Sequence, residues 1–491
     1  MSGYQSTSPQ TFFVSSLSTN GTLLQLAACG TMTALLTGQP SLTFWRFRYL
    51  QYTDFAMLSI VQTFDSQVAF GDTACCKIYK AGDLLYYLYI MLQIPGIRAC
   101  PPRAGSCGPT QQFPYALDPN SPCAVADAEY FSSVDGGANA WLFEQYGSCG
   151  DFVGDCAANA CGGTAAAACD QDPWCYWTNA VGFAIVQWVT LIIGTQTVDQ
   201  LCSEYLYAWE ELAGKPGKRL TEMIGKAYCR EQLIADSQQT KTLYVPLPFW
   251  FTLSPGNALP LVAIMFSGAQ LVVKFNELKN LVIVSGPDIQ VVKCNGGGPL
   301  VAGDLKAAVD GTQIFLQQAE RDKFATYYFE QLITQVQTFQ QCVACQQARI
   351  QLGFTNPIIE FIWMLRRRCA EKMNNWFNFS GLLGLSPLVS AEIDFNSTAR
   401  QPMREEGFYR LLQPYQFHTL LPESCIFNYS FALYPEEPQP SGCVNPNRLE
   451  SMYLVLNIQD GLQAEDVAVI IFARSLNMLK FRDGVAGLSF S

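Results

Sequence analysis

The sequence carries little charge. Charged residues make up only 14% of its 491 residues, whereas soluble globular proteins usually carry about 25%. Apolar residues account for 49% of the chain and aromatic residues for 13%. A chain of this kind either contains a membrane segment or has a large surface that becomes buried against partners.

The sequence also has no apolar run long enough to cross a membrane. The longest runs, residues 182–194 and 259–273, fall short of the roughly 20 residues that a transmembrane helix needs. The N-terminal stretch MSGYQSTSPQTFF has no basic region and no long apolar run, so we predict no secretory signal. Burial against other subunits is therefore the better explanation of the scarce charge.

Positive charge is scarce as well. The net charge is −11 and the sequence pI is about 4.8. This balance argues against direct nucleic-acid binding, which depends on cations that neutralise phosphates. The one basic cluster is Arg366, Arg367 and Arg368, and we interpret it as a solvated or subunit-contact face.

Histidine is almost missing, since His418 is the only one in the chain. One histidine excludes a two-histidine zinc site and leaves little room for a hydrolytic triad. A lone imidazole can still act as a general base at neutral pH. However, the residues that follow, CIFNYSFALY, alternate as in a half-buried strand, and PEEPQPSG then forms a rigid polar loop. We therefore interpret His418 as a structural residue.

Complete catalytic or metal-binding motifs are missing too. Cys342 and Cys345 form a C-x-x-C pair, but no second pair lies nearby to complete a tetrahedral metal site. The glycine-rich residues 294–304 lack the Lys-Ser/Thr of a phosphate-binding loop, which indicates a surface turn. A pair of catalytic carboxylates leaves no local signature, and nothing points to one. We predict no catalytic residue, no cofactor and no metal site.

Extended segments dominate what is present. Residues 41–64, 76–95 and 182–201 are rich in β-branched and aromatic residues and are punctuated by Gly, Pro, Asp or Asn. The sequence AGD at 81–83 predicts a hairpin, and residues 199–214 predict a helix. Many short strands with few helices indicate an all-β sandwich or barrel, such as the jelly rolls of shells and lectins.

The chain divides into two sets of strands and one long irregular insertion. A polar bridge at 234–241 precedes a new set of strands that starts at residue 242. The insertion, residues 95–179, contains eight of the 19 cysteines, which suggests that disulfides, or with less support a metal, hold it together. The disulfide candidates are Cys100, Cys107, Cys123, Cys149, Cys156, Cys161, Cys169 and Cys175.

Several stretches, taken in order, resemble the double jelly-roll major capsid proteins of nucleocytoplasmic large DNA viruses. The most specific is TLYVPLPFWFTLSPGNALPLVAI at 242–264. Others are LTGQPSLTFWRFRYLQYTDFAMLSIVQTF, GDLLYYLYIMLQIP, IIGTQTVDQL with YAWEEL, IFLQQAERDKFATYYFEQLITQVQ, NPIIEFIWMLRR and YRLLQPYQFHTLLP. The chain departs from the family pattern at LQYTDFAM and in its longer insertion at 95–179. Its close relatives resemble viruses of algae or other protists.

The resemblance implies an all-β fold of two tandem jelly rolls, each an eight-stranded antiparallel β-sandwich, with short helices in long loops. We expect an N-terminal arm at 1–20, a first jelly roll at 21–234 with the insertion, and a second at 242–491. The insertion would lie between two strands of the first jelly roll and project from the capsid exterior.

The implied function is that of a structural major capsid protein, not an enzyme. Three copies would form a pseudo-hexagonal capsomer that tiles an icosahedral shell, assembled inside the infected cell. The implied partners are copies of the chain, neighbouring capsomers, minor capsid and penton proteins and an underlying inner membrane, with no direct nucleic-acid contact. Two alternatives remain: a minor capsid protein of the same fold, or a jelly-roll protein that binds or cleaves carbohydrate. Assembly state would separate shell proteins from the last.

Overall fold

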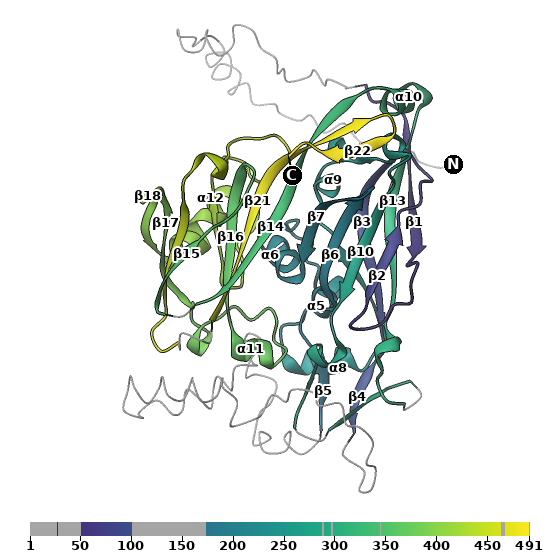
Figure 1. Cartoon of the computed structure of the whole chain (residues 1–491). Helices are drawn as coiled ribbons and strands as arrows, with labels where there is room; N and C mark the ends of the chain where they lie inside the picture. Colours follow the sequence, from purple (N-terminus) through teal and green to yellow (C-terminus); the bar gives the residue numbers. More distant parts are fainter. Residues whose placement is uncertain are drawn as a thin grey trace, which may run out of the picture. The chain divides into compact units, whose positions relative to one another are not determined.

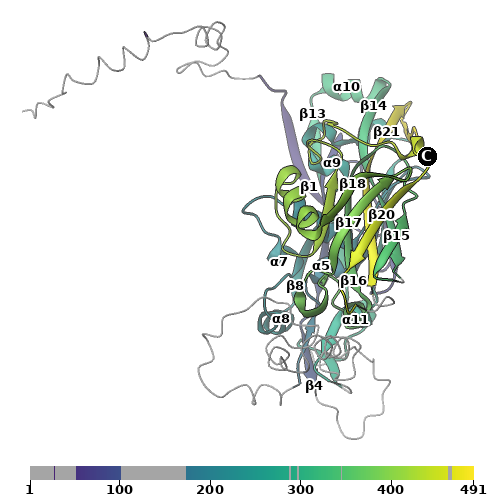
Figure 2. The same ribbon diagram turned by 90° about the vertical axis from the view of Figure 1, so that its left-hand side faces the viewer.

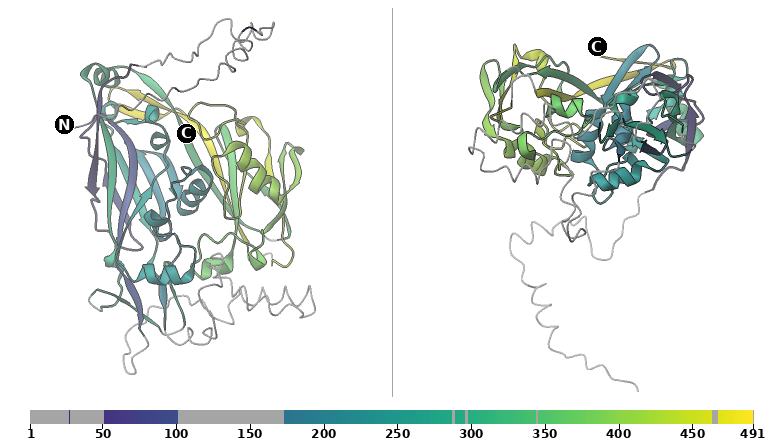
Figure 3. Two further views of the ribbon diagram at one scale, coloured as in Figure 1. Left: turned by 180° about the vertical axis from the view of Figure 1, so that it is seen from behind. Right: turned by 90° about the horizontal axis from the view of Figure 1, so that it is seen from below.

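The computed structural model describes residues 51–100 and 173–490, apart from 287–288, 296–297, 344 and 463–466, together with Ala27. The chain divides into two compact units, Met1–Thr53 and Asp54–Ser491, and the fold described below is that of the second unit. This unit contains two antiparallel β-sandwiches that lie side by side (Figures 1 and 3).

The first sandwich has eight main strands in two sheets. One sheet has the order β1-β13-β3-β8 and the other has the order β2-β10-β6-β7. Numbered along the chain, the sheets therefore run first–eighth–third–sixth and second–seventh–fourth–fifth, which is the topology of a jelly roll. The strands are β1 (Phe55–Thr63), β2 (Thr73–Lys77), β3 (Leu84–Ile94), β6 (Val186–Ile193), β7 (Gln196–Cys202), β8 (Lys241–Pro246), β10 (Ala269–Phe275) and β13 (Lys306–Leu316).

The second sandwich repeats this topology. Its sheets have the orders β14-β21-β16-β19 and β15-β20-β17-β18, again first–eighth–third–sixth and second–seventh–fourth–fifth. The predicted fold class, two tandem jelly rolls, is confirmed. The strands are β14 (Phe329–Cys342), β15 (Gln347–Gln351), β16 (Ile358–Arg367), β17 (Leu388–Phe395), β18 (Thr398–Glu405), β19 (Ile426–Ser430), β20 (Met452–Ile458) and β21 (Val467–Arg482).

The boundary between the jelly rolls differs from the expected one at residues 234–242. Strands β8, β10 and β13 pair with β3, β2 and β1, so residues 241–316 complete the first sandwich. The second begins only at β14, after helix α10 (Gln318–Thr326). Jelly-roll sheets join strands that are distant in sequence. A polar bridge followed by apolar strands therefore looks the same whether the next strand joins an existing sheet or starts a new one.

Short strands and helices occupy the connections. The strands are β4 (Ile97–Cys100), β5 (Cys175–Trp177), β9 (Leu259–Pro260), β11 (Val282–Val284), β12 (Gln290–Lys293) and β22 (Val485–Leu488). The helices are α5 (Val181–Ile185), α6 (Ser203–Ala213), α7 (Thr221–Ile224), α8 (Arg230–Ser237), α9 (Trp250–Leu253), α11 (Arg368–Lys372) and α12 (Gln413–Phe417), and a π-helical turn at Phe408–Leu412 leads into α12. In the part of the chain described above, no helix is both long and apolar enough to span a membrane.

Two local predictions need correction. The helix predicted at 199–214 is present as α6, but residues 199–202 belong to β7, and part of the extended segment 182–201 is the buried helix α5. The hairpin predicted at 81–83 is absent, because β2 and β3 lie in different sheets. Gln313 of β13 fixes this connection instead, since its side-chain oxygen accepts hydrogen bonds from the amides of Ala81 (2.9 Å) and Gly82 (2.6 Å).

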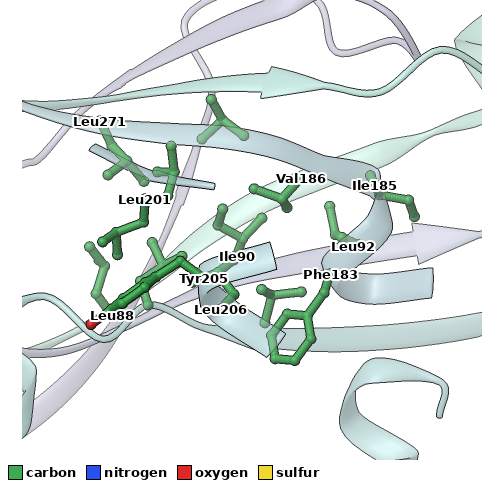
Figure 4. Close-up of a cluster of buried hydrophobic side chains, with 14 of the residues drawn as sticks. Leu88, Ile90, Leu92, Phe183, Ile185, Val186, Leu201, Tyr205, Leu206 and Leu271 are labelled. Carbon is green, nitrogen blue, oxygen red and sulfur yellow. The ribbon is translucent and has the colours of Figure 1, made fainter. Parts of the chain in front are cut away.

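The core of the first jelly roll fills the space between its sheets. Strand β10 alternates strictly between buried and half-buried residues, as a strand with one face on a core should. Helices α5 and α6 add side chains to the same core (Figure 4). Its members include Leu88, Ile90, Leu92, Phe183, Ile185, Val186, Leu201, Tyr205, Leu206 and Leu271, each at most 2% exposed.

Candidate functional site

The two jelly rolls meet at a joint formed by β7 and α6 of the first and the sheet of β14, β21 and β16 of the second. The backbone amide of Val336 in β14 donates a hydrogen bond to Oδ1 of Asp199 in β7 over 3.0 Å. The ring of Tyr205 in α6 meets Phe472 of β21 edge-on, with 5.4 Å between ring centroids. The two sandwiches therefore form one packed body rather than two linked domains.

An ion pair crosses this joint. Nη1 of Arg366 in β16 lies 2.8 Å from Oε1 of Glu204 in α6, and the arginine side chain is only 3% exposed. Burial alone would raise the pKa of Glu204, but the guanidinium of Arg366 outweighs it and lowers this pKa below its ordinary value. The pair remains charged and ties the first jelly roll to the second.

The interpretation of Arg366, Arg367 and Arg368 as one solvated or subunit-contact face is wrong for two of the three. Arg366 is committed to the joint, and Arg367 is buried and donates a hydrogen bond to the carbonyl oxygen of Gly381 over 3.1 Å. Arg368 is exposed at the start of α11. Because the first two arginines end the buried strand β16, their guanidinium groups bind partners inside the protein.

His418 lies in a buried cluster of charges beside the joint. Its Nε2 atom is 2.9 Å from Oε2 of Glu360, and its Nδ1 atom is 2.9 Å from Oε1 of Glu436. The other oxygen of Glu360 lies 2.6 Å from Nη1 of Arg474. Both ring nitrogens face carboxylates, and this geometry favours a proton on each nitrogen and a cationic imidazole.

The pKa values follow from this geometry. Burial would lower the pKa of His418, but the carboxylates of Glu360 and Glu436 outweigh burial and raise it to about 9. Burial would raise the pKa of Glu360, but His418 and Arg474 lower it to about 2. This arrangement supports a structural role for His418. The residue follows α12 rather than lying in a strand, and β19 is buried on both faces instead of alternating.

Arg474 connects the cluster to the joint. Its guanidinium carbon lies 4.1 Å from the centroid of the Trp209 ring in α6, a cation–π contact across the two jelly rolls. The positive charge of Arg474 also acts on the carboxyl group of Asp199. Burial raises the pKa of Asp199 to about 7, although the amides of Val336 and Gln200 and the charge of Arg474 oppose the shift.

The sequence did not single out Glu360, Arg474 or Asp199. Glu360 and Arg474 each interrupt an otherwise apolar run, IIEFIW and VIIFARS. Charged residues are seldom fully buried without a partner, so a charge next to apolar residues in each of two buried strands is a usable signal of a buried ion pair.

The predicted disulfide residues are only partly within the described chain. Cys100 ends β4, Cys175 begins β5, and both carry free thiols. Burial raises the pKa of Cys175 to about 12, with further contributions from nearby Cys294 and Cys100. The two flanks of the insertion therefore lie close together. The other six candidates are outside the described residues: Cys107, Cys123, Cys149, Cys156, Cys161 and Cys169.

The remaining candidate motifs show no metal-binding geometry. Cys342 and Cys345 are exposed, and Sγ of Cys345 lies 2.7 Å from the carbonyl oxygen of Gln347. Among residues 51–100 and the described part of 173–490, no three His, Cys, Asp or Glu side chains form a group that could hold a metal ion.

A cleft of about 550 Å³ opens between the jelly rolls. Two of its cations are ion-paired: Lys226 lies 2.5 Å from Glu211, and Arg410 lies 3.0 Å from Glu406. The rings of Tyr207 and Phe377 stack in its wall with centroids 4.6 Å apart. The stacked rings join the two jelly rolls, whereas each of these ion pairs lies within one jelly roll.

Comparison with known proteins identifies the family. A model described as the N-terminus of major capsid proteins matches residues 43–117 and 124–298, and one described as the major capsid protein of large eukaryotic DNA viruses matches 320–487. The two matches meet close to the observed boundary between the jelly rolls.

Individual relatives agree. The chain is 25% identical over 497 residues to the major capsid protein of Pyramimonas orientalis virus, covering 96% of this chain and 99% of the relative. It is 23% identical over 527 residues to that of Paramecium bursaria Chlorella virus 1, with the same coverage of each chain. These relatives favour a major capsid protein over a carbohydrate-binding or carbohydrate-cleaving protein.

Solved structures show the same fold. A quasi-atomic model of the PBCV-1 virus capsid matches with a TM-score of 0.64 and 21% identity, covering 91% of this chain and all of the other. The Faustovirus major capsid protein matches with a TM-score of 0.62 and 12% identity, covering 92% and 94%. The family models, the relatives and the repeated jelly-roll topology lead to one conclusion: this chain belongs to the major capsid proteins of large eukaryotic DNA viruses, which are structural proteins of the virion capsid and not enzymes.

Proposed function

We propose that three copies of this chain form a pseudo-hexagonal capsomer that tiles an icosahedral shell. The observation that carries the proposal is the repetition of one eight-strand topology within the chain, with the two jelly rolls side by side. One copy thus supplies two similar blocks, and three copies supply the six blocks of a near-hexagonal ring. The scarce charge fits this reading, because permanent subunit interfaces are more apolar than ordinary surface.

Negative-stain imaging of the purified protein tests the proposal. We expect class averages with a near-hexagonal outline and three-fold symmetry. Averages that show single double-sandwich particles at micromolar concentration would contradict it.

We further propose that residues 95–179 project from the outer surface of the capsid. The described flanks of this segment, β4 and β5, lie at one end of the first jelly roll, and α10 and β22 lie at the other (Figure 1). A jelly roll keeps its sheets when such a connection lengthens, because the cost of loop closure grows only with the logarithm of loop length. Limited proteolysis of intact virions should cut within 101–172 first. Cleavage at the α10 end instead would contradict this orientation.

Disulfides among the eight candidate cysteines would stabilise this segment. Each bridge contributes roughly 2–4 kcal/mol in a unit with little core of its own. Because the cytosol is reducing, we expect the bridges to form late in assembly or after release. Peptide mapping of non-reduced virions should recover linked peptides, whereas eight free thiols would refute the proposal. Thiolate-bound zinc is the rival and would appear as metal in the digested protein.

The opposite end of the molecule would face the capsid interior, where minor capsid proteins, penton proteins and an inner membrane are the candidate partners. Large apolar side chains are exposed in the connections there: Phe266 is 79% exposed, Tyr327 68% and Phe490 61%. Cross-linking of disrupted virions followed by mass spectrometry should place these partners near residues 265–267, 327–328 and 485–490. Cross-links to the β4 and β5 end alone would argue against this orientation.

A further inference from the structure

The C-x-x-C pair of Cys342 and Cys345 lies where strand β14 ends and the chain crosses to β15. Cys342 stands opposite Ala468 of β21, at the end of the pairing between these two strands. Val343 turns inward, since it is 4% exposed and its amide donates a hydrogen bond to the carbonyl oxygen of Val467 over 3.1 Å. Both cysteines are exposed and carry free thiols. The motif therefore presents two neighbouring thiols to solvent.

A cation adjoins the first of these thiols. Nη2 of Arg368, the exposed first residue of α11, donates a hydrogen bond to Sγ of Cys342 over 2.8 Å. Reactive cysteines are typically partly exposed and lie in electropositive surroundings, and the C-x-x-C spacing supplies a second thiol close to the first. Sγ of Cys345 instead lies 2.7 Å from the carbonyl oxygen of Gln347. These contacts single out Cys342 as the thiol that reacts first.

Cys342 also lies in the wall of an open groove of about 750 Å³ between the two jelly rolls. Among the described residues, the groove is lined by more cations than carboxylates. The cations are Lys274, Lys279, Arg368 and Lys372, and the carboxylates are Glu277 and Glu371. Each carboxylate already faces a cation of the protein, at 2.6 Å between Lys279 and Glu277 and at 3.9 Å between Arg366 and Glu371. The groove therefore offers a positive surface to a ligand that reaches the sulfur of Cys342.

This groove lies at the end of the molecule that the proposed orientation places outside the capsid. Helix α11, which contributes Arg368 and Lys372, lies at the same end as α8 and β4 (Figures 1 and 2). Strand β4 is one flank of the segment that we propose to project from the outer surface. A released virion has left the reducing cytosol, so thiols on its outer surface meet oxidants.

We propose that Cys342 is a redox-reactive thiol, that the groove beside it recognises an anionic low-molecular-weight disulfide, and that Cys345 resolves the mixed disulfide that forms. The inference goes beyond the proposed capsomer and does not depend on the number of copies in it. The carboxylates of the small disulfide would face Lys372 and the neighbouring cations, while one of its sulfurs approaches Sγ of Cys342. Negative charge is thus the recognised feature, and the sulfur–sulfur bond is the reacting one.

The exchange has two balanced steps. The thiolate of Cys342 attacks one sulfur of the small disulfide, so a new sulfur–sulfur bond forms, the old one breaks and one small thiolate leaves. The thiolate of Cys345 then attacks Sγ of Cys342 and releases the second small thiolate. The protons that the two cysteines lose pass through solvent to the two departing thiolates. Two protein thiols are oxidised to one disulfide, and one small disulfide is reduced to two thiols.

Oxidised glutathione, an anionic disulfide, is the probe for the test. The purified full-length protein is incubated with it, quenched with acid and digested without reduction, and mass spectrometry follows each thiol over time. We expect Cys342 to acquire glutathione, or to become linked to Cys345, at least about tenfold faster than Cys443 acquires glutathione. Cys443 is the matched control, because it is also exposed but does not line the groove. This comparison needs no variant.

Variants assign the separate roles. Cys345→Ser removes the resolving thiol, so glutathione should stay on Cys342. Arg368→Gln should slow the reaction with every disulfide, because the guanidinium contacts the sulfur itself. Lys372→Gln should slow the reaction with oxidised glutathione at least about threefold but leave that with hydroxyethyl disulfide, which is uncharged, unchanged. Arg482→Gln, at a side chain that is 79% exposed and outside the groove, is the control and should change neither rate.

Each outcome decides one part of the proposal. Equal rates at Cys342 and Cys443 would overturn the reactive thiol and its groove together. An equal effect of Lys372→Gln on both disulfides, or no effect on either, would overturn the recognition of the anion. Glutathione that persists on Cys342 of the wild-type protein would overturn the role of Cys345. None of these results bears on the trimer.

Discussion

The Nε2 atom of His418 lies 2.9 Å from Oε2 of Glu360, and both side chains are completely buried. His418 follows α12, whereas Glu360 lies in the middle of strand β16, so the ion pair fixes a long connection to the sheet. Arg474, on the adjacent strand β21, holds the other oxygen of the same carboxylate. One buried anion therefore organises two cations next to the joint between the jelly rolls.

Glu360→Gln should destabilise the protein strongly. The substitution leaves His418 and Arg474 buried without their shared anion, and breaking a buried ion pair in this way costs about 3–5 kcal/mol. Urea unfolding, followed by tryptophan fluorescence at one fixed protein concentration, measures the change. Glu450→Gln, at an exposed loop position, is the control and should change the free energy of unfolding by at most about 0.5 kcal/mol. Equal effects from both variants would show that the buried pair contributes nothing.

His418 should make stability depend on pH in the alkaline range. Its pKa rises from 6.5 in the unfolded chain to about 9 in the fold. The contribution of His418 to the free energy of unfolding is therefore fully present below about pH 6.5 and is lost as the pH rises through about 9. Between pH 6.5 and 9.5, the wild type should lose more stability than His418→Gln, and thermal unfolding of both across this range measures the difference. Parallel pH profiles would mean that His418 is not charged in the fold.

Ionisation of the buried Asp199 should lower the free energy of unfolding at neutral and alkaline pH. Burial raises its pKa from 3.8 to about 7, so the stability linked to its protonated form is lost as the pH rises through about 7. Asp199→Asn keeps an oxygen that can accept the hydrogen bond from Val336 and carries no charge. The variant should therefore gain stability relative to the wild type as the pH rises from about 4 to about 7, and the difference should stay constant above that range. A pH-independent difference in melting temperature would contradict this account.

The core of the first jelly roll should tolerate truncation poorly. Leu271 of β10 is fully buried between the sheets, so Leu271→Ala leaves a cavity that costs about 2–5 kcal/mol. Leu433→Ala, which removes the same atoms from a side chain that is 64% exposed, should cost at most about 0.5 kcal/mol. Urea unfolding of the two variants measures the contrast, and similar losses would place Leu271 outside the core.

The sequence predicted the local structure better than the pairing. The apolar stretches at 76–95 and 182–201 contain strands β3 and β6, because alternation and β-branched residues report burial directly. Which sheet a strand joins depends on contacts between distant residues, such as Ile314 of β13 with Leu84 of β3. The predictions of a hairpin at 81–83 and of a domain boundary at residue 242 were wrong for that reason.

The site was predictable only in part. A single histidine beside a rigid loop was enough to suggest a structural role for His418. Its partners Glu360 and Glu436 stand 58 residues before it and 18 residues after it, and no spacing rule connects them. Arg366 and Arg367 form an apparent basic cluster in sequence, but the end of a buried strand gives them internal partners instead.

The mass of the purified native protein tests the central claim most directly. One chain has a mass of 54.4 kDa, so a capsomer of three copies has a mass of about 163 kDa, three times that value. Native mass spectrometry of the wild-type protein at micromolar concentration should show the trimer as the dominant species. A dominant species at 54.4 kDa that persists as the concentration is raised would contradict the account.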